Sequence, residues 1–190
     1  MEKIGSVAVS MNLVSDSTDA KAIGRCSIID QYIRIGCRAL MDSERLTQQS
    51  GDLGGSIGMK AVGTACCFQG FELLLKYIVK REGLKIDTTL KEKGQHPVSH
   101  YLEAIQQHKG LELEKYLRDH IDPKSLYCPK NFWSVLIKEL HKEFMNARYI
   151  GVGKKKSMVN SRPAHHVAHV YNAFVHVFPN DGLLAINLAE

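Results

Sequence analysis

One short segment in the last quarter of the chain gathers acid/base groups and a cation. Residues 161–171 read Ser-Arg-Pro-Ala-His-His-Val-Ala-His-Val-Tyr. In a helix, the arginine and the three histidines of this segment fall within an arc of about 100°, whereas the tyrosine lies on the opposite side. Imidazole gives or takes a proton near neutral pH, and guanidinium holds a phosphate through two hydrogen bonds. This face therefore suits phosphodiester chemistry, with the residues Arg162, His165, His166 and His169 as its candidates.

Positive charge is concentrated around this segment. The net charge of the whole chain is only +5. Residues 141–190, however, hold six Lys/Arg and five His against three acidic residues. Three of the cations are the consecutive Lys154, Lys155 and Lys156, which precede the segment. Such a run can hold an RNA backbone or can be a solvated loop between two helices, and the sequence leaves both interpretations open.

Length and composition are those of an ordinary globular protein. The chain has 190 residues, of which 44% are hydrophobic and 24% charged. We expect a single domain over 1–190, in which residues 1–18 can be flexible and residues 183–190 form a C-terminal tail. No apolar run approaches the ~20 residues that a membrane span needs, and residues 1–17 lack the features of a secretory signal. We therefore expect a cytoplasmic protein with no membrane partner.

Metal binding is a competing interpretation of the histidines. His165 and His169 are four residues apart, a spacing at which two imidazoles can share one zinc ion. No glutamate lies between them, and no third protein ligand of obvious geometry is near in the sequence. The five cysteines form no Cys-x-x-Cys pair, which argues against a structural zinc site and a disulfide framework. We predict no metal and no cofactor.

The hydrophobic pattern predicts an all-α fold. Apolar residues recur at spacings of three and four, and no alternating run is flanked by hairpin turns. We expect helices over about 19–46, 59–82, 97–107, 111–121 and 131–150 and from Ser161 or Arg162 onwards, with a glycine-rich connection over 50–58. Mostly short loops favour an up-and-down antiparallel bundle of five to six helices. Its core should contain Phe68, Phe71, Leu75, Phe132, Leu136, Leu140 and Phe144.

Four of the expected helices, the second, third, fifth and last, carry motifs of a known family. Residues 65–76 read Ala-Cys-Cys-Phe-Gln-Gly-Phe-Glu-Leu-Leu-Leu-Lys and are followed by Gly83. This resembles the second helix of HEPN domains, with its aromatic-Glu-Leu-x-x-Lys pattern and later glycine. Within it, Glu72 lies on an apolar stripe and needs a partner, which Lys76 or Arg148 can supply.

Further motifs follow in the same order as in that family. A Gly-His-x-Leu-like opening of the next helix can be filled by residues 94–98 or by 100–102. Residues 144–149, Phe-Met-Asn-Ala-Arg-Tyr, resemble the Arg-Tyr end of the long HEPN helix. The catalytic signature of the family is Arg, four to six residues, then His, sometimes continued as His-x-Tyr. Arg162 and His169-Val170-Tyr171 match it at the long limit.

The resemblance implies a metal-independent endoribonuclease of a toxin, defence or stress system. In such an enzyme His169 would be the general base toward the ribose 2′-hydroxyl, and Arg162 would stabilise the phosphate charge. We favour His166 as the helper of His169. The site would lie at a homodimer interface, and an antitoxin is the partner that this setting implies. The residues that we expect to bind RNA or a nucleotide are Lys154, Lys155, Lys156, Arg148 and Tyr171.

A departure from the family pattern supports an alternative. The residue after the arginine is usually polar in active members, and here it is Pro163. The alternative is a non-catalytic HEPN module that binds a nucleotide or RNA, for example as the partner of a nucleotidyltransferase. The direction in which Arg162 and His169 point separates the two functions.

Overall fold

The computed structural model describes residues 17–49, 53–86, 98–121, 130–148, 164–179 and 182–187. Within these ranges the chain forms five helices and no strand. They are α1 (Ser17–Gln49), α2 (Leu53–Arg81), α3 (Val98–His120), α4 (Phe132–Arg148) and α5 (Ala164–Val177). The prediction of an all-α helical bundle is confirmed.

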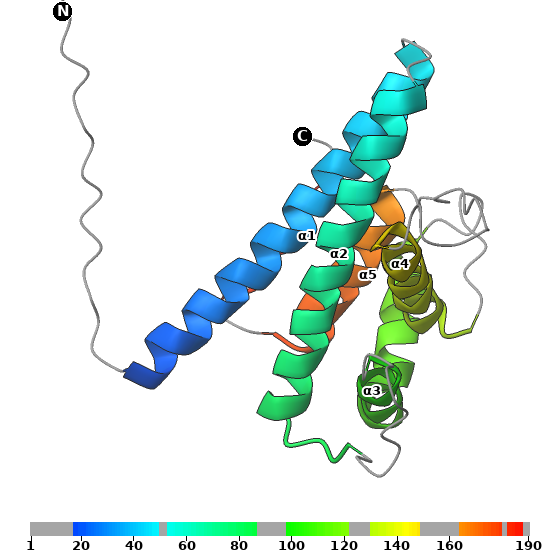
Figure 1. Ribbon diagram of the computed structural model, residues 1–190. Helices are drawn as coiled ribbons and strands as arrows, with labels where there is room; N and C mark the ends of the chain where they lie inside the picture. The colour runs from blue at the N-terminus through cyan, green and yellow to red at the C-terminus, as the bar shows by residue number, and fades with distance from the viewer. Residues whose placement is uncertain are drawn as a thin grey trace, which may run out of the picture.

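Helices α1 and α2 form a long antiparallel hairpin, and the other three helices pack against it (Figure 1). α5 packs against α1 and α3, while α2 also contacts α3 and α4. α2 is thus a central helix, as its apolar circumference predicts. Among the described residues it is also the only helix, over Gly54–Arg81, with the length and composition to cross a membrane. Most of that window is buried inside the bundle, and the core helix of a soluble protein has the same composition.

The core contains the side chains that the sequence pattern selects. Six of the seven predicted residues are buried, and Phe144 packs against the same cluster with part of its surface exposed. Trp133 and Phe174 join them, with their rings edge to face at 5.6 Å between centroids. Tertiary packing of these apolar faces, rather than helix propensity, holds the five helices together.

The predicted start of α2 is wrong. α2 begins at Leu53, inside the segment predicted to be a loop. The buried Ser56 in its first turns donates to the carbonyl of Ser43, and its hydroxyl lies 2.6 Å from that of Thr47, both on α1. These contacts compensate for the low helix propensity of the nearby glycines. The predicted break near Gly110 is confirmed, because the two halves of α3 meet at a kink at Lys109, where the backbone is not helical.

Close contact between α1 and α2 depends on Gly36. A Cβ atom built there would lie 2.8 Å from the backbone nitrogen of Cys67 and 2.9 Å from the carbonyl oxygen of Gly63. Both neighbours are backbone atoms of α2, so the helices themselves would have to separate. By contrast, a Cβ atom at Gly24 on the same helix would meet nothing within 4 Å.

This pair of glycines gives a matched test of the hairpin. We expect Gly36→Ala to lower the free energy of unfolding by about 1–3 kcal/mol because it overpacks the interface. Gly24→Ala should raise it by up to about 1 kcal/mol because alanine is the better helix former. Chemical denaturation of both variants measures the difference. Equal effects of the two substitutions would contradict close packing of the hairpin at Gly36.

Candidate functional site on helices α3 and α5

Helix α5 turns one side into the core and presents histidines on the other. Its side chains Val167, Val170 and Phe174 are fully buried. His165 and His176 are exposed, and His169 is half-buried. These histidines follow one another at spacings of four and seven residues, so they form one stripe along the helix.

Helix α3 brings further rings to this stripe. It runs antiparallel to α5, because Lys109 lies beside Val177 while His120, eleven residues later, influences His169. The ring centroids of Tyr116 and His120 are 3.9 Å apart and stacked, and those of Tyr116 and His176 are 4.7 Å apart. We call this set, made of Tyr116, His120, His165, His169 and His176, the histidine surface.

His169 is the member best suited to accept a proton. Burial lowers its pKa, and positive charge on His165 and His120 lowers it further. The imidazole of His169 is therefore neutral at pH 7. The His165 ring lies 6.4 Å from the His169 ring, centroid to centroid. The arrangement thus combines one neutral imidazole with exposed imidazoles that can supply a proton when they are charged.

His166 does not belong to this stripe in the way that we predicted. Its ring stands edge-on against Phe132 of α4, with 5.7 Å between the centroids. The adjacent His165, rather than His166, is the α5 histidine whose charge acts on His169. The reason is helical geometry, since residues i and i+4 stack along one side whereas residue i+1 turns by about 100°. The structure therefore places His165 on the same stripe as His169 and places His166 against α4, and the helper role itself stays a prediction.

Tyr171 is buried, so the prediction that it binds RNA or a nucleotide is wrong for this arrangement. Its side chain is fully inside the bundle, and its hydroxyl donates to Asp30 Oδ1 at 3.0 Å. The other carboxylate oxygen of Asp30 accepts from Arg34 Nε at 2.7 Å. Burial and the charge of Asp30 raise the pKa of Tyr171 well above its usual range. Tyr171 therefore holds α5 against α1.

The C-terminal segment strengthens the same contact. Arg34 donates to the carbonyls of Leu184 and Ala185 at 3.2 and 3.1 Å. Asn172 of α5 exchanges two hydrogen bonds with the backbone of Ile186. The described part of the predicted tail, 182–187, is thus attached to α1 and α5 and fixes the position of α5.

The cationic candidates lie largely outside the described residues. Residues 149–163 include Lys154, Lys155, Lys156, Arg162 and Pro163, so their positions relative to His169 stay predictions. Arg148 is the last residue of α4, and its side chain is likewise outside the described part. Glu72, by contrast, forms the predicted ion pair with Lys76, at 2.6 Å.

The described residues contain no group of three or more His, Cys, Asp or Glu side chains able to hold a metal ion. His165 and His169 are close, but their rings stand at 83° to each other.

Sequence reasoning missed Tyr116, His120 and His176. The sequence did contain a signal for His176, because it lies seven residues after His169 and residues seven apart share a helix face. Nothing local connects Tyr116 or His120 to α5, since that contact is made only when α3 packs antiparallel against it.

Comparison with protein-family models, with curated proteins and with solved structures finds no match for this chain. The resemblance to HEPN domains therefore depends on the sequence motifs alone.

Proposed function

We propose that this protein is a HEPN-like, metal-independent endoribonuclease that uses the histidine surface. The observation that carries the proposal is the environment of His169. Its imidazole is half-buried and lies 6.4 Å from the His165 ring, centroid to centroid, and its pKa is lowered by burial first and then by the charges of His165 and His120. A neutral imidazole beside imidazoles that can be protonated is the combination that cleavage of a phosphodiester by acid/base catalysis requires.

The reaction follows from these roles. His169 removes the proton from a ribose 2′-hydroxyl, and the 2′ oxygen then attacks the adjacent phosphorus. The bond from phosphorus to the 5′ oxygen breaks, and the leaving oxygen takes a proton from a charged imidazole, for which His165 and His120 are the candidates. Arg162 stabilises the negative charge on the phosphate. The products are a 2′,3′-cyclic phosphate and a free 5′-hydroxyl.

The RNA backbone would be held by the basic residues that border α5. Lys154, Lys155, Lys156 and Arg148 precede that helix and are the proposed contacts. One copy supplies a single Arg162, so we propose that two copies combine their residues in a shared cleft of a homodimer. A toxin or defence setting, with an antitoxin as partner, is part of the same proposal.

Purified protein should cleave single-stranded RNA in excess chelator. The ends of the products identify the reaction, because attack by the 2′ oxygen leaves a 2′,3′-cyclic phosphate or, after hydrolysis, a 3′-phosphate. Gel electrophoresis with end-group analysis measures both. Cleavage that chelator abolishes and zinc restores would contradict the proposal and support a metal-dependent reaction.

A second function is favoured by the ring stack of Tyr116, which is half-buried, and His120, which is exposed. Planar rings offer a platform on which a nucleobase can stack. In this alternative the protein binds a nucleotide or RNA without cleaving it, for example as the partner of a nucleotidyltransferase. Binding of nucleotide by wild-type protein that leaves every tested RNA intact would favour this function over the nuclease.

A further inference from the structure

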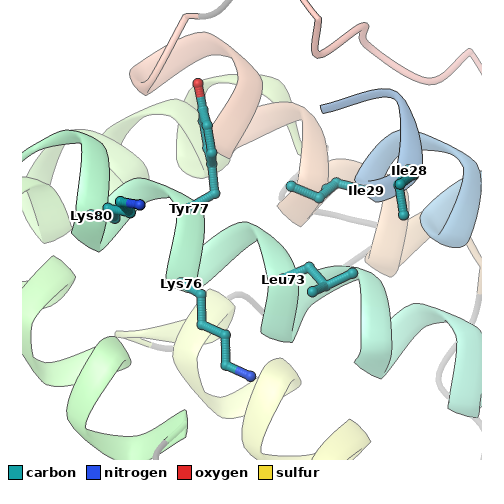
Figure 2. A pocket seen from close by; sticks show the side chains of 6 residues that line it. All are labelled: Ile28, Ile29, Leu73, Lys76, Tyr77 and Lys80. Carbon is teal, nitrogen blue, oxygen red and sulfur yellow. The ribbon is translucent and has the colours of Figure 1, made fainter. Parts of the chain in front are cut away.

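A pocket of about 300 Å³ opens between α1 and α2, away from the histidine surface. It is lined by Ile28 and Ile29 of α1 and by Leu73, Lys76, Tyr77 and Lys80 of α2 (Figure 2). Ile28 lies two residues before Asp30, whose carboxylate binds Tyr171 of α5. Residues two apart project from nearly opposite sides of a helix, so the pocket is on the side of α1 turned away from α5.

The apolar surface continues beyond the pocket along α1. Ile28, Tyr32 and Ile35 are 49%, 37% and 56% exposed and are spaced by four and three residues. They therefore form one stripe on the helix. Scattered exposed apolar residues need no explanation, but a contiguous group that leads into a pocket marks a binding surface.

The pocket is lined by two lysines, and only one of them is paired with a carboxylate. Lys76 is bound to Glu72 at 2.6 Å. Lys80, one turn further along α2, is exposed, and its ammonium group has no hydrogen-bond or ion-pair partner among the described residues. A cationic ligand would be repelled here, and an uncharged one would leave the ammonium group unused. An anion would complement it.

We propose that this pocket binds an amphiphilic anion with a single alkyl chain. Its carboxylate or phosphate head lies against the Lys80 ammonium group, and its chain lies on Ile28 and Leu73 and extends toward Tyr32 and Ile35. The volume is near the lower end of the range for ligand pockets, roughly 300–1,000 Å³, which suits one chain rather than a two-chain lipid. This site is separate from the histidine surface and independent of RNA.

Titration with decanoate below its micellar concentration tests the proposal. Decanoate should bind at one site by calorimetry and shift the methyl NMR signals of Ile28, Ile29 and Leu73 while leaving those of buried α4 residues in place. Decyltrimethylammonium, with the same chain and the opposite charge, should bind at least about ten-fold more weakly. Equal affinity for the two would overturn the role of Lys80.

Matched variants distinguish binding of the charged head group from binding of the alkyl chain. Lys80→Ala should weaken decanoate binding about two- to five-fold, whereas Lys138→Ala, an exposed lysine on α4, should not change it. Leu73→Glu should abolish binding, whereas Leu111→Glu, at a leucine that is 76% exposed on α3, should leave it intact. Unchanged circular dichroism verifies that the variants fold.

Two results would assign the surface to a different occupant. If light scattering shows a dimer that Leu73→Glu dissociates, and decanoate shifts no pocket methyl, a second copy covers the surface. If decanoate does not bind but vesicles of anionic phospholipid do, the surface meets a bilayer. Either result overturns the proposal of a single-chain ligand.

Discussion

Replacement of His169 by alanine is expected to lower the rate of RNA cleavage by about 100-fold or more. A positioned general base contributes about 10²–10⁴-fold to such a reaction. Alanine removes this half-buried imidazole, whose pKa is lowered. Initial rates with wild-type and variant protein measure the loss. His100→Asn, on another part of α3, is the control for general effects of losing a histidine, and an unchanged rate for His169→Ala would exclude His169 as the base.

The pH dependence of the rate gives a second readout of the same residue. A general base works only when it is neutral, so the acidic limb of the pH profile should follow the pKa of His169, with activity falling as the pH drops below it. Because burial and the charges of His165 and His120 lower that pKa, the fall should begin below the ordinary histidine value of about 6.5. The same acidic limb should be absent from the residual activity of His169→Ala. A limb centred above 6.5 would assign the titration to another group.

A mixture of two inactive variants tests the shared cleft. In a heterodimer of Arg162→Ala and His169→Ala subunits, one chain still supplies an arginine and the other a histidine. We expect the mixture to recover part of the activity that each variant lacks by itself, since both groups then meet across one interface. Light scattering establishes the oligomeric state. A fully active monomer would contradict the shared-site mechanism while leaving His169 as the base.

Replacement of Leu136 by alanine is expected to lower the free energy of unfolding by about 2–5 kcal/mol. Leu136 is almost fully buried in the core, where alanine would leave a cavity. Lys138→Ala, on the exposed side of the same helix, and Lys85→Ala, in the segment after α2, should change it by less than about 0.5 kcal/mol. Urea denaturation compares the midpoints, and similar shifts for the buried and exposed sites would contradict the core assignment.

The helices and the core were predictable because their signals are local. Apolar residues that recur at spacings of three and four identify the buried face of a helix, whichever element that face packs against. This is why Phe68, Leu136 and Leu140 were correctly predicted as core. Glycine is another local signal, and Gly83 ends α2 as predicted, with a φ of 62° that favours glycine.

The start of α2 depends on tertiary contacts, which the spacing of apolar residues in the sequence does not reveal. The glycine-rich start of α2 has poor helix propensity, and contacts with α1, among them the hydrogen bonds of Ser56, stabilise it as a helix. These tertiary contacts outweigh a preference of about 1 kcal/mol per residue. Gly110, by contrast, is a local signal that correctly marked the kink of α3 at Lys109.

The sequence by itself determined that α5 carries a stripe of histidines, because positions on one helix have known relative directions. It did not determine what faces that stripe. Only the tertiary structure buries half of His169, which is the main cause of its lowered pKa, and only the antiparallel packing of α3 adds the influence of His120. The same holds for Tyr171, whose motif position suggested a ligand but whose side chain lies buried against Asp30. Burial and charge environment arise from residues far apart in the chain, so they are properties of the folded bundle and not of the local pattern.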